Sequence, residues 1–98
     1  MGKHKPYSLL SAVKALIVGG KGRITQSAVN GGRLLGFDES GIIETVLALT
    51  PADFYKSMTT HADHTIWQDV YRPSLPAGDV YLKLTVLDDV LIVSFKEL

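Results

Sequence analysis

Hydrophobic residues in the first half of the chain recur every three or four positions, which is the spacing of one face of an α-helix. The first such segment predicts a helix over residues 8–18, capped by Ser8 and ended by the glycine pair that follows. Its apolar stripe consists of Leu10, Val13 and Ile17. Because Ser11 and Lys14 interrupt the apolar run, we expect an amphipathic helix and neither a secretory signal nor a membrane span.

Two more helices are predicted before residue 50. Thr25 is placed to cap one that runs to about Leu35, although Asn-Gly-Gly at residues 30–32 lowers helix propensity by roughly 1 kcal/mol per glycine. We therefore expect this helix to be short or bent. Asp38 is placed to cap the next helix, whose apolar stripe consists of Ile42, Val46 and Leu49, widened by Ile43 and Leu47.

A fourth helical segment is predicted from Thr50, because a cap residue followed by proline and an early acidic residue is typical of a helix start. Phe54 and Met58 would share a face of that helix. From Asp63 to Tyr71 apolar and polar residues alternate instead, which predicts a β-strand. The period therefore changes from helix to strand between these two segments.

Two strands rich in β-branched residues are predicted at residues 80–86 and 90–95, after a loop with two prolines at residues 72–78. Helices followed by an antiparallel meander predict an α+β fold, with the helices packed on one face of the sheet. A hydrophobic fraction of 46% argues against a disordered chain, and 98 residues fit one domain, 1–98.

A two-residue turn at Asp88 and Asp89 would determine which residues of the last two strands face each other. One face is then apolar and is expected in the core: Leu82 opposite Phe95, Leu84 opposite Val93, and Val86 opposite Leu91. The other face pairs Tyr81 with Lys96, Lys83 with Ser94, and Thr85 with Ile92. Opposed Cβ atoms lie about 4.5–5.5 Å apart, so the tyrosine and lysine could act on one ligand atom. Taken alone, such a pair is more often ordinary solvated surface.

Charge is distributed unevenly, although the formal net charge is zero. Residues 1–37 hold six basic residues and no acidic one, whereas residues 38–98 hold four basic and ten acidic residues. This asymmetry fits either the steering of a polyanion or a solvated helical surface. The absence of cysteine excludes disulfides and thiolate metal sites and fits a reducing cytoplasm, where we expect the protein to act.

A long string of the second half resembles the motility quorum-sensing regulator toxins, the MqsR type of RNA-cleaving toxin. It comprises DFYKSMTTHADHTIWQDVYRP at residues 53–73, followed by GDVYLKLTV and DDVLIVSFKE. The likeness covers essentially the whole chain and is weaker over residues 1–50. It implies a RelE-like α+β ribonuclease fold, cleavage of messenger RNA at GC-containing triplets such as GCU, and growth arrest. It also implies neutralisation by an antitoxin with a zinc-binding N-terminal domain and a helix-turn-helix DNA-binding domain.

The resemblance also implies four catalytic residues, carried over by motif. The lysine of DFYK is Lys56, the glutamine of TIWQD is Gln68, the tyrosine of VYLK is Tyr81, and the lysine of SFKE is Lys96. The last two are the pair that the hairpin register already places opposite each other. Weaker candidates for holding RNA, by base stacking or phosphate contact, are Tyr55, Met58, Arg72 and Lys83.

Cleavage of RNA without a metal needs a base for the 2′-hydroxyl, positive charge beside the phosphorane, and an acid for the leaving 5′-oxygen. We assign Lys56 and Lys96 to the phosphate, with one of them as a possible base, Tyr81 to proton transfer and Gln68 to positioning. The products would be 2′,3′-cyclic phosphate and 5′-hydroxyl ends. We expect no cofactor and no metal.

Other interpretations remain open from the sequence. His61 and His64 suggest a metal or a base, but two histidines three residues apart without a matched ligand are a weak signal. Trp67 and Tyr71 could stack bases, yet aromatic residues alternating along a strand more often belong to the core. From other classes of function, a non-catalytic RNA-binding or translation-regulating module comes next, and a protein-interaction module third. The chain has no DNA-binding motif, so we expect no direct DNA binding by the protein alone.

Overall fold

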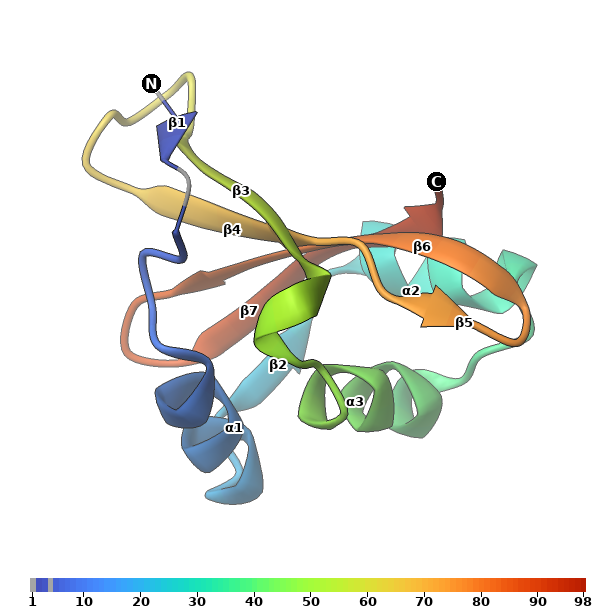
Figure 1. Cartoon of the computed structure of the whole chain (residues 1–98). Coiled ribbons are helices and arrows are strands. Elements are labelled where there is room, and N and C mark those ends of the chain that lie inside the picture. Colours follow the sequence, from blue (N-terminus) through green and yellow to red (C-terminus); the bar gives the residue numbers. More distant parts are fainter. Residues whose placement is uncertain (1, 4) are drawn as a thin grey trace.

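A mixed β-sheet and three helices make up the computed structural model, which describes residues 2–3 and 5–98 (Figure 1). The helices are α1 (Leu10–Val18), α2 (Gln26–Leu34) and α3 (Glu39–Leu47), followed by a 3₁₀ turn, η1 (Pro51–Asp53). The strands are β1 (Gly2–Lys3), β2 (Gly22–Ile24), β3 (Phe54–Thr59), β4 (Trp67–Tyr71), β5 (Ser74–Leu75), β6 (Gly78–Val86) and β7 (Val90–Glu97). The predicted α+β class, with helices first and strands later, is confirmed.

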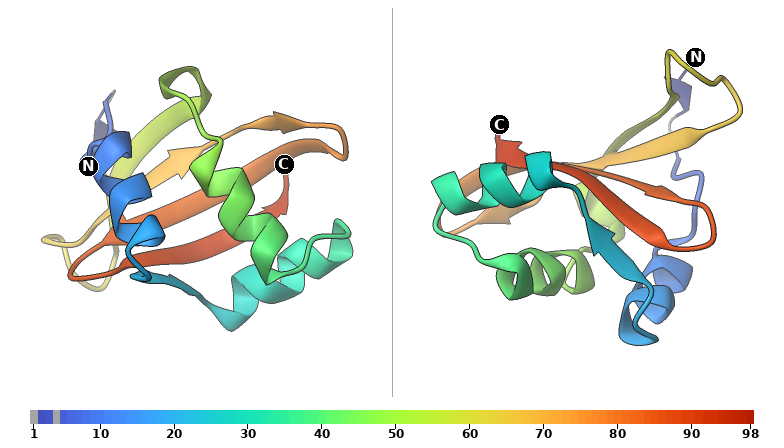
Figure 2. Two further views of the ribbon diagram at one scale, coloured as in Figure 1. Left: turned by 90° about the horizontal axis from the view of Figure 1, so that it is seen from below. Right: turned by 180° about the vertical axis from the view of Figure 1, so that it is seen from behind.

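The strands follow the order β1-β3-β4-β6-β7-β2, and β5 pairs only with β6. All neighbours are antiparallel except β2, which runs parallel to β7 at the edge. Helices α1 and α3 cover one face of the sheet, whereas α2 lies beside β7 (Figure 2). In the described part of the chain, the other face of the sheet therefore carries no helix.

Helix α2 is regular despite its glycines, which lie where the helix contacts its neighbours closely. Thr25 caps the helix as predicted: its hydroxyl accepts a hydrogen bond from the Ala28 amide and donates one to the Val93 carbonyl at 2.9 Å. A Cβ on Gly31 would lie 2.0 Å from the Phe95 carbonyl oxygen, where no side chain fits. Gly31 thus costs helix propensity but permits packing against β7, and Gly32 leaves room for the Ile42 side chain of α3.

Helices α1 and α3 bury the predicted stripes. Asp38 caps α3 by accepting a hydrogen bond from the Gly41 amide at 2.7 Å. Ser8 is not the cap of α1, because the helix begins at Leu10 and Leu9, which has no capping side chain, occupies the cap position. The Ser8 amide donates a hydrogen bond to the carboxylate of Asp69. The buried stripe residues are Val13, Ile17, Ile42, Val46 and Leu49. Among residues 2–3 and 5–98, no helix is long and apolar enough to cross a bilayer.

The helix predicted from Thr50 is wrong beyond its first turn. The start signal is present, since the Asp53 carboxylate accepts hydrogen bonds from the Thr50 amide at 2.8 Å and hydroxyl at 3.2 Å. The chain then extends into β3, where side chains alternate between the two faces of the sheet. Ser57 is fully buried there, between partly exposed neighbours. Pairing with β4 satisfies this backbone, so tertiary contacts override the local helix signal.

Strand β4 begins later than predicted, at Trp67 rather than Asp63. Residues 60–66 form a turn in which the Thr60 amide donates to the Ile66 carbonyl at 3.0 Å. The Asp63 carboxylate also accepts hydrogen bonds from the amide and hydroxyl of Thr65. These local bonds replace the first part of the expected ladder.

The last hairpin agrees with the prediction at its open end and differs near its turn. The confirmed pairs are Tyr81 with Lys96, Leu82 with Phe95 and Lys83 with Ser94. A β-bulge then shifts the register, and the next pairs are Leu84 with Ile92, Thr85 with Leu91 and Val86 with Val90. The turn spans residues 87–89, one residue more than expected, and the bulge compensates for it. Val90 and Ile92 are consequently buried in place of Leu91 and Val93, and Thr85 is buried too.

Candidate active site

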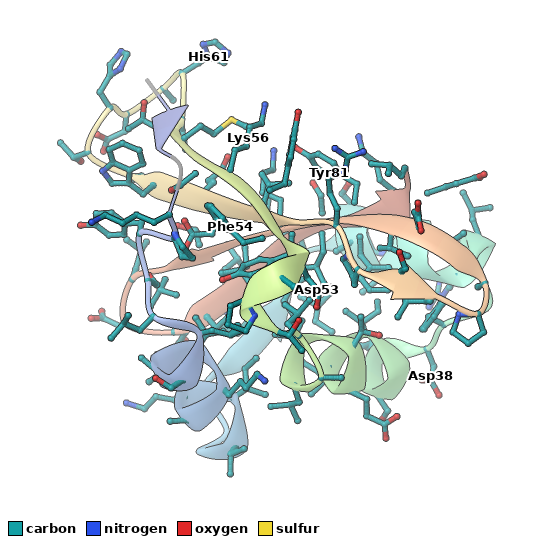
Figure 3. All side chains as sticks on the ribbon, in the orientation of Figure 1. Asp38, Asp53, Phe54, Lys56, His61 and Tyr81 are labelled. Atoms are coloured by element: carbon teal, nitrogen blue, oxygen red, sulfur yellow. The ribbon has the colours of Figure 1, made fainter. Side chains whose placement is uncertain are left out.

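The sheet face without a helix carries most of the residues predicted to act on RNA. In the ladders, Lys56 of β3 pairs with Val70 of β4, Val70 with Lys83 of β6, and Lys83 with Ser94 of β7. Paired residues of antiparallel strands point to the same face, so this row crosses the sheet on one side. Figure 3 shows Lys56 and Tyr81 on the side away from α3.

The neighbouring pairs on that side complete the predicted set. Met58 pairs with Gln68 next to Lys56, and Tyr81 pairs with Lys96 next to Lys83. We call this surface the polar face; its members are Lys56, Met58, Gln68, Tyr81, Lys83 and Lys96, together with Tyr55 and Arg72. The fold thus brings the four predicted catalytic residues together from four different strands, and their individual roles remain a prediction.

Cations and aromatic rings alternate on the polar face. The Lys96 Nζ atom lies 5.2 Å from the centroid of the Tyr81 ring. The Tyr55 ring, half-exposed beside a bulge in β3, lies 4.5 Å from the Arg72 guanidinium carbon and 5.4 Å from the Lys56 Nζ atom. Contacts below about 6 Å are attractive, so the rings hold these cationic groups over the sheet.

Every basic residue after residue 37 lies on the polar face: Lys56, Arg72, Lys83 and Lys96. The same part of the sequence contains ten acidic residues. Among the acidic residues within β3, β4, β6 and β7, it is Asp79, at the start of β6, whose side chain points to the polar face. Its carboxylate accepts a hydrogen bond from the Ser74 hydroxyl at 2.9 Å. The acidic half of the chain therefore presents a positively charged surface.

Lys83 occupies the middle of this surface, although the sequence indicated it only as a residue that holds RNA. Burial lowers the pKa of its ammonium group, and the positive charges of Lys96 and Lys56 lower it further. Removal of water and of compensating negative charge both disfavour the protonated form of an amine. Lys83 is distinguished by its position on β6, between β4 and β7. The order of strands in the sheet cannot be read from the spacing of residues along the sequence.

A buried carboxylate supports the site from the opposite face of the sheet. Asp69 lies next to Gln68 and accepts a hydrogen bond from the Ser57 hydroxyl at 2.6 Å. The Tyr7 and Ser8 amides also donate to it, at 2.9 and 3.0 Å. These bonds join β3, β4 and the segment before α1, so they hold Lys56 and Gln68 in register. Sequence reasoning missed Asp69, although an aspartate between Trp67 and Tyr71 on the inward side of a strand was a usable signal.

The remaining candidates lie away from the polar face. Tyr71 is fully buried in the core, where burial and the charge of Asp69 raise its pKa to about 12. Trp67 stacks on Tyr7, with ring centroids 5.5 Å apart. His61 and His64 are exposed in the turn after β3, and His61 sits at its tip (Figure 3). Within the described part of the chain, no group of three histidine, aspartate or glutamate side chains could hold a metal ion.

Comparison with known proteins agrees with the resemblance seen in the sequence. A family model described as "Motility quorum-sensing regulator, toxin of MqsA" matches residues 5–97. A curated relative from Escherichia coli (strain K12), named mRNA interferase toxin MqsR, is 56% identical over 97 residues and covers 99% of both chains. The match extends over both the helices and the strands that carry the polar face. The chain therefore belongs to the motility quorum-sensing regulator family of toxins.

Proposed function

We propose that this protein is an endoribonuclease toxin that cleaves messenger RNA in the cytoplasm without a metal ion and so inhibits translation and growth. The observation that carries this proposal is the collection of all basic residues after residue 37 on one sheet face, around a tyrosine. Single-stranded RNA is a polyanion, and a flat cationic surface with aromatic rings suits it. The name of the E. coli relative, an mRNA interferase toxin, supports the same substrate.

In the proposed reaction a base of the site takes the proton of the RNA 2′-hydroxyl, the 2′-oxygen attacks the adjacent phosphorus, and the 5′-oxygen leaves with a proton from an acid. Lys56 and Lys96 stabilise the negative charge that develops on the phosphorane, and Tyr81 transfers a proton to the leaving oxygen. Gln68, held in register by its neighbour Asp69, positions the phosphate through its amide group. Each positioned acid or base contributes about 10²–10⁴-fold, and preorganised charge contributes a comparable factor. The products are a 2′,3′-cyclic phosphate and a 5′-hydroxyl.

Substrate selection is assigned to the rest of the polar face. The exposed Tyr55 ring, with Arg72 against it at 4.5 Å, offers a stacking surface for a base beside the scissile bond. Met58 lies next to Gln68 and would contact the neighbouring base or ribose. We propose that these residues contribute to a preference for GC-containing triplets such as GCU.

The family description names a protein partner, since it calls the members toxins of MqsA. We propose that a cognate antitoxin, with a zinc-binding N-terminal domain and a helix-turn-helix DNA-binding domain, neutralises this protein. The helix-turn-helix domain of the antitoxin would bind DNA, so the toxin itself needs no DNA-binding surface.

The decisive experiment incubates a defined transcript with the purified protein in EDTA and maps the cut ends. We expect cleavage that EDTA does not inhibit, with fragments ending in 2′,3′-cyclic phosphate and 5′-hydroxyl. Abolition of cutting by EDTA, or recovery of 5′-phosphate ends, would contradict the mechanism. Binding of the transcript without any cutting would favour the alternative function, a non-catalytic RNA-binding or translation-regulating module.

A further inference from the structure

Lys83 is the central cation of the polar face. It lies on β6, flanked by Val70 on β4 and by Ser94 on β7 in the same row. Val70 is fully buried although it faces the side without helices, so neighbouring side chains of this face close over it. Lysine stems commonly cover apolar surface in this way and leave only the amine accessible. Lys83 and Lys56 are only partly exposed, whereas Lys96 is exposed.

The charged groups that face Lys83 come from every neighbouring strand and are almost all positive. They are Lys56 on β3, Arg72 after β4 and Lys96 on β7, with the phenols of Tyr81 and Tyr55 among them. Asp79 is the carboxylate on this side, and it lies four residues away along β6, or about 13 Å. Its hydrogen bond from Ser74 draws it toward β5. No compensating negative charge therefore adjoins Lys83 among the described residues of these strands.

Tyr81 lies two positions from Lys83 on the same side of β6, so the two side chains are neighbours about 7 Å apart along the strand. If the scissile phosphate binds between them, the 2′-hydroxyl of the preceding ribose can face one of these two side chains and the leaving 5′-oxygen can face the other. In-line displacement requires the attacking and leaving oxygens on opposite sides of phosphorus. A base and an acid separated in this way match that requirement.

We infer that Lys83 is the general base of the cleavage reaction, an assignment that rests on the proposed function and leaves Lys56 and Lys96 to the phosphate. The neutral amine of Lys83 takes the proton from the 2′-hydroxyl while the bond from the 2′-oxygen to phosphorus forms. The bond from phosphorus to the 5′-oxygen breaks, and the leaving oxygen takes the phenolic proton of Tyr81. Exchange with water then returns a proton to Tyr81 and removes one from Lys83, so no proton is gained or lost overall.

The pKa direction agrees with this role. A base must be unprotonated to act, and burial together with the charges of Lys96 and Lys56 lowers the pKa of Lys83 toward the working pH. The cleavage rate should therefore rise with pH and level off below the value of 10.5 that is ordinary for a lysine.

The test is the pH dependence of single-turnover cleavage by the wild type and by Lys83→Arg, in EDTA. Arginine keeps the positive charge but does not lose its proton in proteins. We expect Lys83→Arg to lose about 10²-fold or more at pH 7, and its residual rate to keep rising with hydroxide instead of levelling off. Binding to a 2′-O-methyl RNA, which cannot react, should stay within about threefold because the charge is retained. Lys21→Arg, an exposed lysine before β2, is the matched control.

A second variant separates a base from a fixed charge. In Lys83→Ala, added ethylamine should restore part of the cleavage in proportion to its free-base concentration, whereas Lys21→Ala should not respond. Rescue that follows total ammonium, or Lys83→Arg with a normal rate and pH profile, would show that Lys83 supplies charge alone. In both cases the wild type still cleaves RNA, so only this inference fails. A wild type that cuts no RNA would overturn the proposed function and this role with it.

Discussion

At the residue scale, the Tyr81–Lys96 pair separates function from stability. The two side chains lie opposite each other on the polar face, with Lys96 Nζ 5.2 Å from the Tyr81 ring, while Leu82 and Phe95 occupy the core side of the same strands. Activity and folding therefore depend on alternate residues of one hairpin.

Tyr81→Phe and Lys96→Ala should each lower cleavage by about 10²-fold or more, because each removes a group that acts mainly in the transition state. The free energy of unfolding should change by no more than about 0.5 kcal/mol, as for other surface substitutions, and thermal unfolding measures it. The double variant should lose much less than the product of the two factors, since both groups serve one step. Lys21→Ala is the control for loss of an exposed lysine elsewhere. Near-normal cleavage by both single variants would place the active site elsewhere.

At the element scale, the contact between α2 and β7 connects the fold to the site. Gly31 faces the Phe95 carbonyl oxygen, and a Cβ on it would also lie 3.4 Å from the Cβ of Lys96. The helix therefore lies directly beside the strand segment that carries a predicted catalytic lysine.

Gly31→Ala should destabilise the protein by about 1–3 kcal/mol and lower cleavage, because α2 or β7 must shift to accept the new methyl group. Alanine improves helix propensity by only about 1 kcal/mol, which a contact of 2.0 Å with backbone outweighs. Gly19→Ala is the matched control, since its Cβ would meet nothing nearer than 3.4 Å. Thermal unfolding and cleavage assays check both variants, and a Gly31→Ala protein as stable as the wild type would refute this account of the glycine.

At the scale of the whole molecule, a formal net charge of zero conceals a surface suited to a polyanion. Residues 38–98 hold four basic and ten acidic residues, yet all four basic side chains lie on the polar face. A local concentration of charge, rather than the overall charge, is what attracts RNA.

Binding of a 2′-O-methyl RNA should weaken steeply with salt. If Lys56, Arg72 and Lys96 each contact a phosphate, the logarithm of the binding constant should fall against the logarithm of salt concentration with a slope of about −2. Arg72→Gln should make that slope shallower by about 0.7, whereas Lys21→Gln should leave it unchanged. Fluorescence anisotropy over a range of salt concentrations measures both. A slope near zero would show that the polar face does not bind the RNA backbone.

The sequence by itself determined the features that depend on nearby residues. Thr25 and Asp38 cap their helices and the helix stripes are buried, because caps and helical faces are set by short-range spacing. Tyr81 faces Lys96 as predicted because the extra turn residue and the bulge offset each other. The resemblance in the strand motifs added the identities of the four catalytic candidates. Even the error at the hairpin turn was local, since one extra turn residue was absorbed by one bulge.

Tertiary structure decided the features that depend on residues far apart in the chain. Residues 54–59 form a strand and not a helix, because β4 supplies their hydrogen-bond partners and Asp69 holds Ser57. Lys56 and Lys83 lie in one row of the sheet because β4 pairs with both of their strands. The spacing of residues along the chain does not reveal this arrangement. The lowered pKa of Lys83 arises from burial and from cations on other strands, so it exists only once the sheet is assembled.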